Sequence, residues 1–145
     1  MRLAVNSTFA MILKAIPDET VFDDQSILDV SRALVFRFDD ADDEVRITVT
    51  TTLILLIPCI HKEEESRRVE EILHAGFIHL DDGNFAVREA VFKLLKAYRS
   101  KFSKEFFKEA DIFKNKHTHP ALVDKLINLP LDEEECLPAG SKNTE

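Results

Sequence analysis

Histidine and cysteine are the side chains of this sequence that are best suited to binding a transition metal. The five histidines are His61, His74, His79, His117 and His119, and the two cysteines are Cys59 and Cys136. No set of them has the spacing of a zinc site, since His74 and His79 are five residues apart and so lie on different faces of a helix. We therefore expect no metal and no other cofactor. Two cysteines outside any CxxC pair indicate a reducing compartment.

Two acidic pairs, Asp39-Asp40 and Asp81-Asp82, could suggest a calcium site. A calcium loop, however, needs alternating oxygen ligands around a central glycine and a closing glutamate. We expect these pairs to end one helix and begin the next. Nucleophilic catalysis would require a cysteine or serine with a base and an orienting group, and no such trio is marked. We expect that the protein is not an enzyme; an enzyme would instead show a deep pocket with a perturbed acid or base.

The acidic pairs belong to a longer repeated motif. Phe38-Asp39-Asp40 is followed by Val45-Arg46, and Leu80-Asp81-Asp82, 42 residues later, is followed by Val87-Arg88. A period near 40, with an apolar helix on either side of an acidic turn, is typical of a HEAT-type helical repeat. We therefore predict an all-α fold, an α-α superhelix of the HEAT/ARM solenoid type with about six helices.

The repeat also reaches the start of the chain. Val5, Phe9 and Ile12 align with Val49, Leu53 and Leu56 at a spacing of 44. Met1 would then begin inside a repeat, at its second helix, and residues 1–130 would form a solenoid that starts mid-repeat, either as an excised piece or as a shortened relative. Terminal repeats usually carry a polar cap, whereas the edge around Leu3, Phe9 and Ile12 is apolar. We predict self-association through this truncated N-terminal edge, for example as a symmetric dimer.

Composition narrows the function classes. Hydrophobic residues make up 45% of 145 residues, enough for one domain with a core. The net charge of −8 argues against a nucleic-acid partner, because phosphate binding needs an excess of lysine and arginine. The longest apolar run, residues 53–60, is far short of the roughly 20 residues that span a bilayer. We expect a cytoplasmic protein with no membrane partner and no signal peptide.

The first five expected helices cover about residues 2–15, 25–38, 43–60, 63–80 and 85–101. An amphipathic stretch over 103–116 and a last helix capped by Thr118 follow them. Residues 131–145 are expected to form a flexible acidic tail. Pro17 ends the first helix, Asp23 or Asp24 caps the second, and Asn84 caps the fifth. Glutamates 63–65 suit the start of the fourth. Residues 47–57 are rich in β-branched side chains that favour strands. We nevertheless predict a helix there, because the matching segment 88–98 is clearly helical.

Basic side chains gather in one part of this acidic chain. Residues 85–117 hold nine lysines and arginines against four acidic residues, so the rest of the chain carries −13. We name as the basic stripe the predicted partner-binding residues Lys93, Lys96, Arg99, Lys101 and Lys104. Their spacing favours a shared, slowly rotating helix face that could receive an acidic segment of a partner, although a solvated face is the simpler interpretation. Arg46 and Arg88 could also contact a partner, but pairing with an acidic turn residue of the neighbouring repeat is the favoured prediction.

Several segments in succession resemble a known family. They are residues 38–46, residues 78–82, residues 90–96, and Lys116-His117 ahead of residues 122–127. This order is similar to the C-terminal end of the axonemal dynein assembly factors built of HEAT repeats, over roughly residues 25–130. The resemblance implies a non-enzymatic cytoplasmic scaffold that assists preassembly of dynein arms for motile cilia or flagella, with axonemal dynein heavy and intermediate chains, and chaperones, as protein partners. The alternative, which needs only the generic repeat, is a general HEAT-repeat adaptor for trafficking or for a phosphatase complex.

Overall fold

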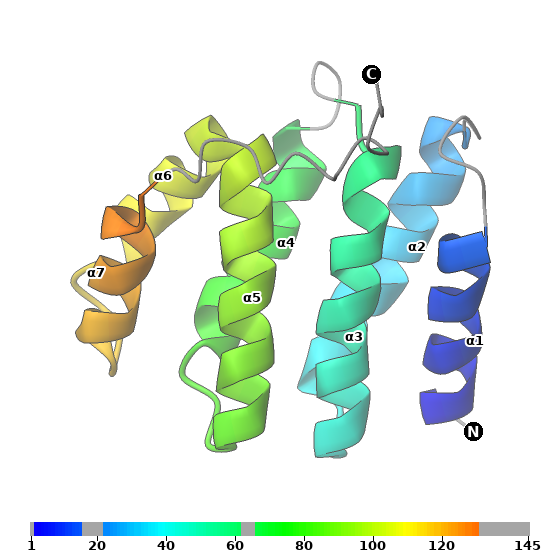
Figure 1. Cartoon of the computed structure of the whole chain (residues 1–145), viewed down its shortest axis with the longest axis horizontal. Helices are drawn as coiled ribbons and strands as arrows, with labels where there is room; N and C mark the ends of the chain where they lie inside the picture. The colour runs from blue at the N-terminus through cyan, green and yellow to red at the C-terminus, as the bar shows by residue number, and fades with distance from the viewer. Residues whose placement is uncertain (1, 16–21, 62–65, 131–145) are drawn as a thin grey trace, which may run out of the picture.

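The computed structural model describes residues 2–15, 22–61 and 66–130 (Figure 1). Four sequence expectations lie outside these ranges: the helix stop at Pro17, the glutamates at 63–65, Cys136 and the acidic tail over 131–145. Within the described ranges, no helix is both long enough and apolar enough to cross a membrane.

Seven α-helices occupy the described residues, against about six expected. They are α1 (Arg2–Ala15), α2 (Asp24–Phe36), α3 (Asp43–Leu56), α4 (Ser66–His79), α5 (Phe85–Lys101), α6 (Ser103–Phe113) and α7 (Pro120–Asn128), with short 3-10 turns η1 (Arg37–Asp39) and η2 (Ile57–Cys59). The helices lie in two rows, which Figure 1 shows one behind the other. We call α2, α4 and α6 the first row, and α1, α3, α5 and α7 the second row. Successive pairs α2/α3, α4/α5 and α6/α7 stack side by side, which confirms the prediction of an all-α helical-repeat solenoid.

The threonine-rich α3 is helical, as predicted against its local propensity. The hydroxyls of Thr48 and Thr52 donate to the backbone carbonyls four residues earlier, each at 2.8 Å, and the hydroxyl of Thr50 donates to the carbonyl three residues earlier at 2.7 Å. Such bonds satisfy a threonine hydroxyl inside a helix, where it would otherwise compete with the backbone. Thr50 and Thr52 are therefore buried without an unpaired polar group, and tertiary packing overrides the strand preference.

Polar side chains cap the starts of three helices, α2, α3 and α5. The carboxylate of Asp23 accepts the amide of Ser26, and the amide oxygen of Asn84 accepts the amide of Ala86, so both caps were predicted correctly. The expected cap of the last helix, Thr118, is wrong. The helix begins one residue later than that cap would place it, at Pro120, and the amide of Thr118 instead donates to Asp81 at 2.9 Å. The chain before α7 is therefore fixed by the acidic turn of the preceding repeat.

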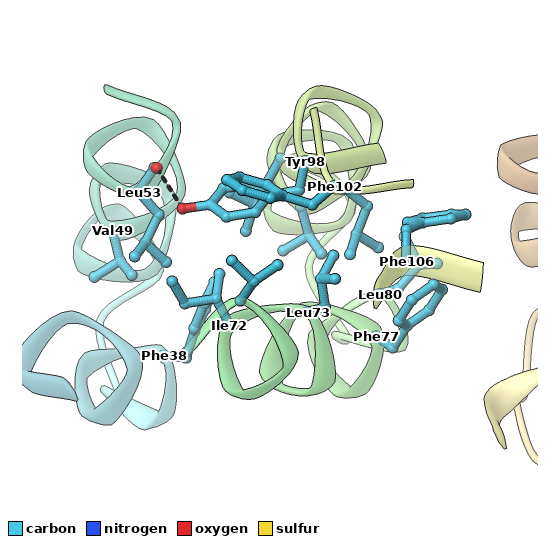
Figure 2. Close-up of a cluster of buried hydrophobic side chains, with 14 of the residues drawn as sticks. Phe38, Val49, Leu53, Ile72, Leu73, Phe77, Leu80, Tyr98, Phe102 and Phe106 are labelled. Carbon is cyan, nitrogen blue, oxygen red and sulfur yellow. Dashed lines mark hydrogen bonds between the residues drawn. The ribbon is translucent and has the colours of Figure 1, made fainter. Parts of the chain in front are cut away.

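The repeat register places equivalent apolar residues in the core. In α3 and the turn that follows it, Val49, Leu53, Leu56 and Ile60 are at most 2% exposed. The residues 42 positions later are buried as well: Val91, Leu95, Tyr98 and Phe102. Figure 2 shows several of these side chains meeting between the rows, where they pack on first-row residues such as Ile72 and Phe77.

Tyr98 is fully buried, and its hydroxyl donates to the carbonyl of Leu53 at 2.8 Å (Figure 2). Burial, the larger effect, and the nearby Cys59 raise the pKa of Tyr98 far above its ordinary value of about 10. A raised folded-state pKa means that the stability contribution of the neutral phenol is complete below about pH 10 and is lost as the pH rises above that value.

Alkaline titration tests this burial directly, because Tyr98 is the only tyrosine of the chain. We expect tyrosinate absorbance to appear only together with loss of helical circular dichroism. In denaturant, the same group should titrate near pH 10. Tyrosinate that forms near pH 10 while the helices remain intact would contradict the buried hydrogen bond.

Candidate interaction surfaces

The acidic pairs of the motif build the same turn twice, once between α2 and α3 and once between α4 and α5. Oδ1 of Asp40 accepts the backbone amide two residues later at 3.1 Å, and Oδ1 of Asp82 does the same at 2.8 Å. Nη1 of Arg46 donates to the carbonyl of Asp40, and Nη1 of Arg88 to the carbonyl of Asp82, both at 2.7 Å. The acidic pairs therefore lie in the turns between successive helices, as predicted, but the residues that cap the next helices are Asp42 and Asn84.

Arg46 also joins its own turn to the turn of the next repeat. Its Nε lies 3.0 Å from Oδ2 of Asp82, and the two side chains are 13% and 9% exposed. Beside this pair, Nδ2 of Asn84 donates to Oδ2 of Asp43 at 2.6 Å. Pairing with an acidic turn residue of the neighbouring repeat is thus confirmed for Arg46. Arg88 instead contacts the carbonyls of its own turn.

Three of the histidines each contact a carboxylate of an adjacent repeat. The pairs are His74 with Glu109 at 3.0 Å, His79 with Asp39 at 3.3 Å, and His117 with Asp81 at 3.0 Å. Nε2 of His117 also lies 3.2 Å from the backbone carbonyl of Phe77. Across the described part of the chain, no three His, Cys, Asp or Glu residues are grouped to hold a metal ion. These histidines join repeats.

Cys59 lies half-buried at the end of η2. Burial raises the pKa of its thiol, and the nearby ammonium of Lys101 lowers it by a smaller amount. Since the thiolate is the nucleophile and reactive cysteines have lowered pKa values, this environment holds Cys59 in its unreactive form at neutral pH.

The basic stripe does not lie on one exposed face. Lys93, Lys96 and Lys104 are exposed, whereas Arg99 is only 6% exposed. Nη2 of Arg99 donates to the carbonyls of residues 127 and 129 at the end of α7, at 3.2 and 2.7 Å, and its guanidinium lies over the ring of Phe107. The expectation of a shared exposed face is therefore wrong for Arg99. Its charge holds α7 against α5 rather than facing solvent.

Lys101 is also engaged within the fold. Its Nζ donates to the carbonyls of Ile57 and Ile60 at 2.7 and 2.9 Å, and so covers carbonyls that follow α3. Of the five basic residues, Arg99 and Lys101 bind backbone carbonyls of neighbouring helices, and Lys93, Lys96 and Lys104 are exposed. Partner binding by the exposed lysines stays a prediction.

A groove of about 620 Å³ runs between α2 and α4, on the first-row side, and the sequence did not reveal it. Its apolar lining comes from Val35, Ala75 and Ile78. Each of its four carboxylates already lies within 4 Å of a basic or imidazole group: Asp39 with His79, Glu70 with Lys108, Glu71 with Arg67 and Glu109 with His74. Each carboxylate of the groove therefore already has a side-chain partner within the fold.

One sequence signal could have identified the buried arginine. Leu95, Tyr98, Arg99 and Phe102 stand at positions i, i+3, i+4 and i+7, so Arg99 falls within the apolar stripe of α5. The inter-repeat histidine pairs carry no such signal, because each depends on how one repeat is placed on the next.

The fold and these surfaces define a helical-repeat protein that presents elongated helix faces. No protein-family model matches the sequence, and no solved structure shows significant similarity to it. Three curated relatives do match, and all are dynein axonemal assembly factor 5 from vertebrates. The chain is 33% identical to the Xenopus laevis protein over 99 residues, which are 66% of this chain. It is 23% identical to the human protein over 109 residues, and 25% identical to the mouse protein over 107 residues.

The matched regions are short parts of long relatives. They span 12% of the length of the frog protein, 13% of the human protein and 12% of the mouse protein. The similarity therefore concerns one section of those proteins. It agrees with the resemblance that the sequence motifs indicate.

Proposed function

We propose that this chain belongs to the HEAT-repeat axonemal dynein assembly factors and acts as a non-enzymatic scaffold in the cytoplasmic preassembly of dynein arms for motile cilia or flagella. The observation that carries the proposal is the similarity to dynein axonemal assembly factor 5, at 33% identity over 99 residues. The stacked helix pairs support it, because solenoids offer extended faces for binding other proteins. The partners proposed are axonemal dynein heavy and intermediate chains, together with chaperones that act on them.

Affinity capture tests the proposed partners. The tagged chain is expressed in differentiating multiciliated or flagellate cells, and its bound proteins are identified by mass spectrometry. We expect enrichment of axonemal dynein heavy chains over an unrelated helical-repeat protein of similar size and charge. Trafficking or phosphatase subunits in place of dynein chains would favour the general adaptor and overturn the proposal.

The exposed lysines of α5 give the proposal a residue-level prediction. Reversing charge with Lys93→Glu and Lys96→Glu is expected to lower recovery of an acidic dynein segment by about tenfold, because both side chains are solvent-facing on the second row. The change should alter the free energy of unfolding by less than about 1 kcal/mol, as is usual at exposed sites. Capture efficiency and thermal unfolding are the two measurements.

A matched double reversal is available in the same basic segment. Lys114→Glu and Lys116→Glu change the net charge by the same amount at two exposed positions between α6 and α7. Only the α5 variant should lose capture. Equal losses for both variants would indicate a general effect of charge, and unchanged capture by the α5 variant would show that Lys93 and Lys96 do not bind the client.

A further inference from the structure

Three exposed lysines from two helices gather where α7 packs against α5. Lys93 and Lys96 lie one turn apart on α5, and Lys125 lies on α7. The ammonium of Lys125 stands 5.3 Å from the centroid of the Phe92 ring, and Phe92 is the residue before Lys93. The fold therefore places a cation of a second helix beside the two lysines of α5. We call Lys93, Lys96 and Lys125 the lysine cluster.

The two helices that carry the lysine cluster have an excess of positive charge. Together, α5 and α7 hold six basic side chains and two acidic ones, Glu89 and Asp124. Two of the basic side chains, Arg99 and Lys101, bind backbone carbonyls, so no carboxylate offsets their charge there. A surface with such an excess attracts a segment of the opposite sign.

The chain itself has such a segment directly after α7. Residues 132–135 read Asp-Glu-Glu-Glu, and we call them the acidic segment. Its starting point is fixed by the fold, because the carbonyl of Leu129 accepts Nη2 of Arg99 at 2.7 Å. Arg99 stands one turn after Lys96 on α5. The described chain therefore leaves α7 beside the lysine cluster.

The length of chain after Leu129 matches the distance to be covered. An extended chain spans at most about 3.5 Å per residue, so the acidic segment can reach points roughly 10 to 20 Å from Leu129. Lys93 lies six residues before Arg99, which is about 9 Å along a helix. The whole lysine cluster is therefore within reach of the acidic segment of the same chain.

We propose that the acidic segment docks on the lysine cluster of its own chain. A short tether gives an effective concentration of the order of millimolar, so that contacts that are weak between separate molecules become occupied. The contact does not depend on the proposed dynein role. One consequence does rest on that role: an acidic client segment that binds the lysines of α5 has to displace the chain's own acidic segment first.

Zero-length crosslinking tests the proposal on the whole chain. A carbodiimide joins a carboxylate to an amine that touches it, and mass spectrometry identifies the joined residues. We expect crosslinks from the acidic segment to the lysine cluster at a yield at least about fivefold above those to Lys114 and Lys116, because the tether favours nearby lysines. These two control lysines are also exposed, but they lie between α6 and α7. Salt at about 1 M should remove the preference, because it screens exposed charges.

A mixture of 15N-labelled and unlabelled chains shows whether each crosslink forms within one chain. A charge-neutral variant gives a second measurement: Asp132→Asn with Glu133→Gln, Glu134→Gln and Glu135→Gln. In this variant, an amine-acetylating reagent should modify the lysine cluster at least about threefold faster than in the unmodified chain, and Lys114 at an unchanged rate. Helical circular dichroism should be the same for both, which separates the effect from unfolding.

Three results would overturn the proposal. They are equal crosslinking to the control lysines, crosslinks that join labelled to unlabelled chains instead of forming within one chain, and acetylation rates that do not differ between the variant and the unmodified chain. None of these measurements involves dynein. Their failure would leave the proposed function standing, and failure to capture dynein chains would leave this contact standing.

Discussion

Replacing Phe77 with alanine is expected to lower the free energy of unfolding by about 3 to 5 kcal/mol. Phe77 is completely buried in α4, and its ring lies 5.4 Å from the ring centroids of both Phe106 and Phe113 in α6. Figure 2 shows Phe77 and Phe106 side by side. Because the phenyl ring fills the contact between two repeats, its removal leaves a cavity and weakens the attachment of α6 and α7. Urea unfolding followed by circular dichroism measures the loss.

Phe36→Ala provides the same chemical change at a site that is 71% exposed. Its cost should stay below about 1 kcal/mol, as for most surface substitutions. A similar cost for the two variants would mean that Phe77 does not pack between the repeats as described.

Replacing Asp82 with alanine should cost about 3 kcal/mol, the second largest effect we expect. The Asp82 carboxylate accepts the amide of Asn84 and pairs with Arg46 of the preceding repeat, with both charged side chains largely removed from water. Its loss leaves a guanidinium that is only 13% exposed with one of its two carboxylate partners, because Asp43 in the same helix is the carboxylate that remains. We therefore expect the contact between the two repeats to be lost at a lower denaturant concentration than in the unsubstituted chain. The measurement is the loss of helical circular dichroism as denaturant is added.

The control for Asp82 is Asp39→Ala, at an acidic side chain that is 84% exposed. It should cost less than about 1 kcal/mol, because exposed ion pairs contribute little. A double-mutant cycle with Arg46→Ala and Asp82→Ala should yield a coupling energy of about 1 to 3 kcal/mol. A coupling energy near zero would show that this pair does not join the repeats.

The fold could be predicted from the spacing of apolar residues within each helix and from the 42-residue repeat of the sequence. The fifth expected helix, 85–101, has the bounds of α5, and its cap Asn84 was identified because capping is a property of a few neighbouring residues. The threonine-rich α3 was also predicted as a helix. Its own residues favour a strand, but the segment of α5 that lies 42 residues later has a clear helical pattern.

Contacts made by one repeat with another could not be predicted in this way. The burial of Arg99 depends on where the carbonyls at the end of α7 lie, and the sequence does not give their position. The cap predicted at Thr118 is wrong because the sequence does not show that Asp81 binds the amide of Thr118. Both errors concern the last repeat, where the acidic-turn motif is absent and the 42-residue register no longer guides the assignment.

Removal of this protein from a cell that builds motile cilia or flagella tests the central claim most directly. The measurement is the amount of axonemal dynein heavy chain on isolated axonemes, with and without re-expression of the chain. A scaffold for preassembly predicts that dynein arms are depleted from the axonemes and restored by re-expression. Axonemes with a full complement of dynein arms in the absence of the protein would contradict the assembly role.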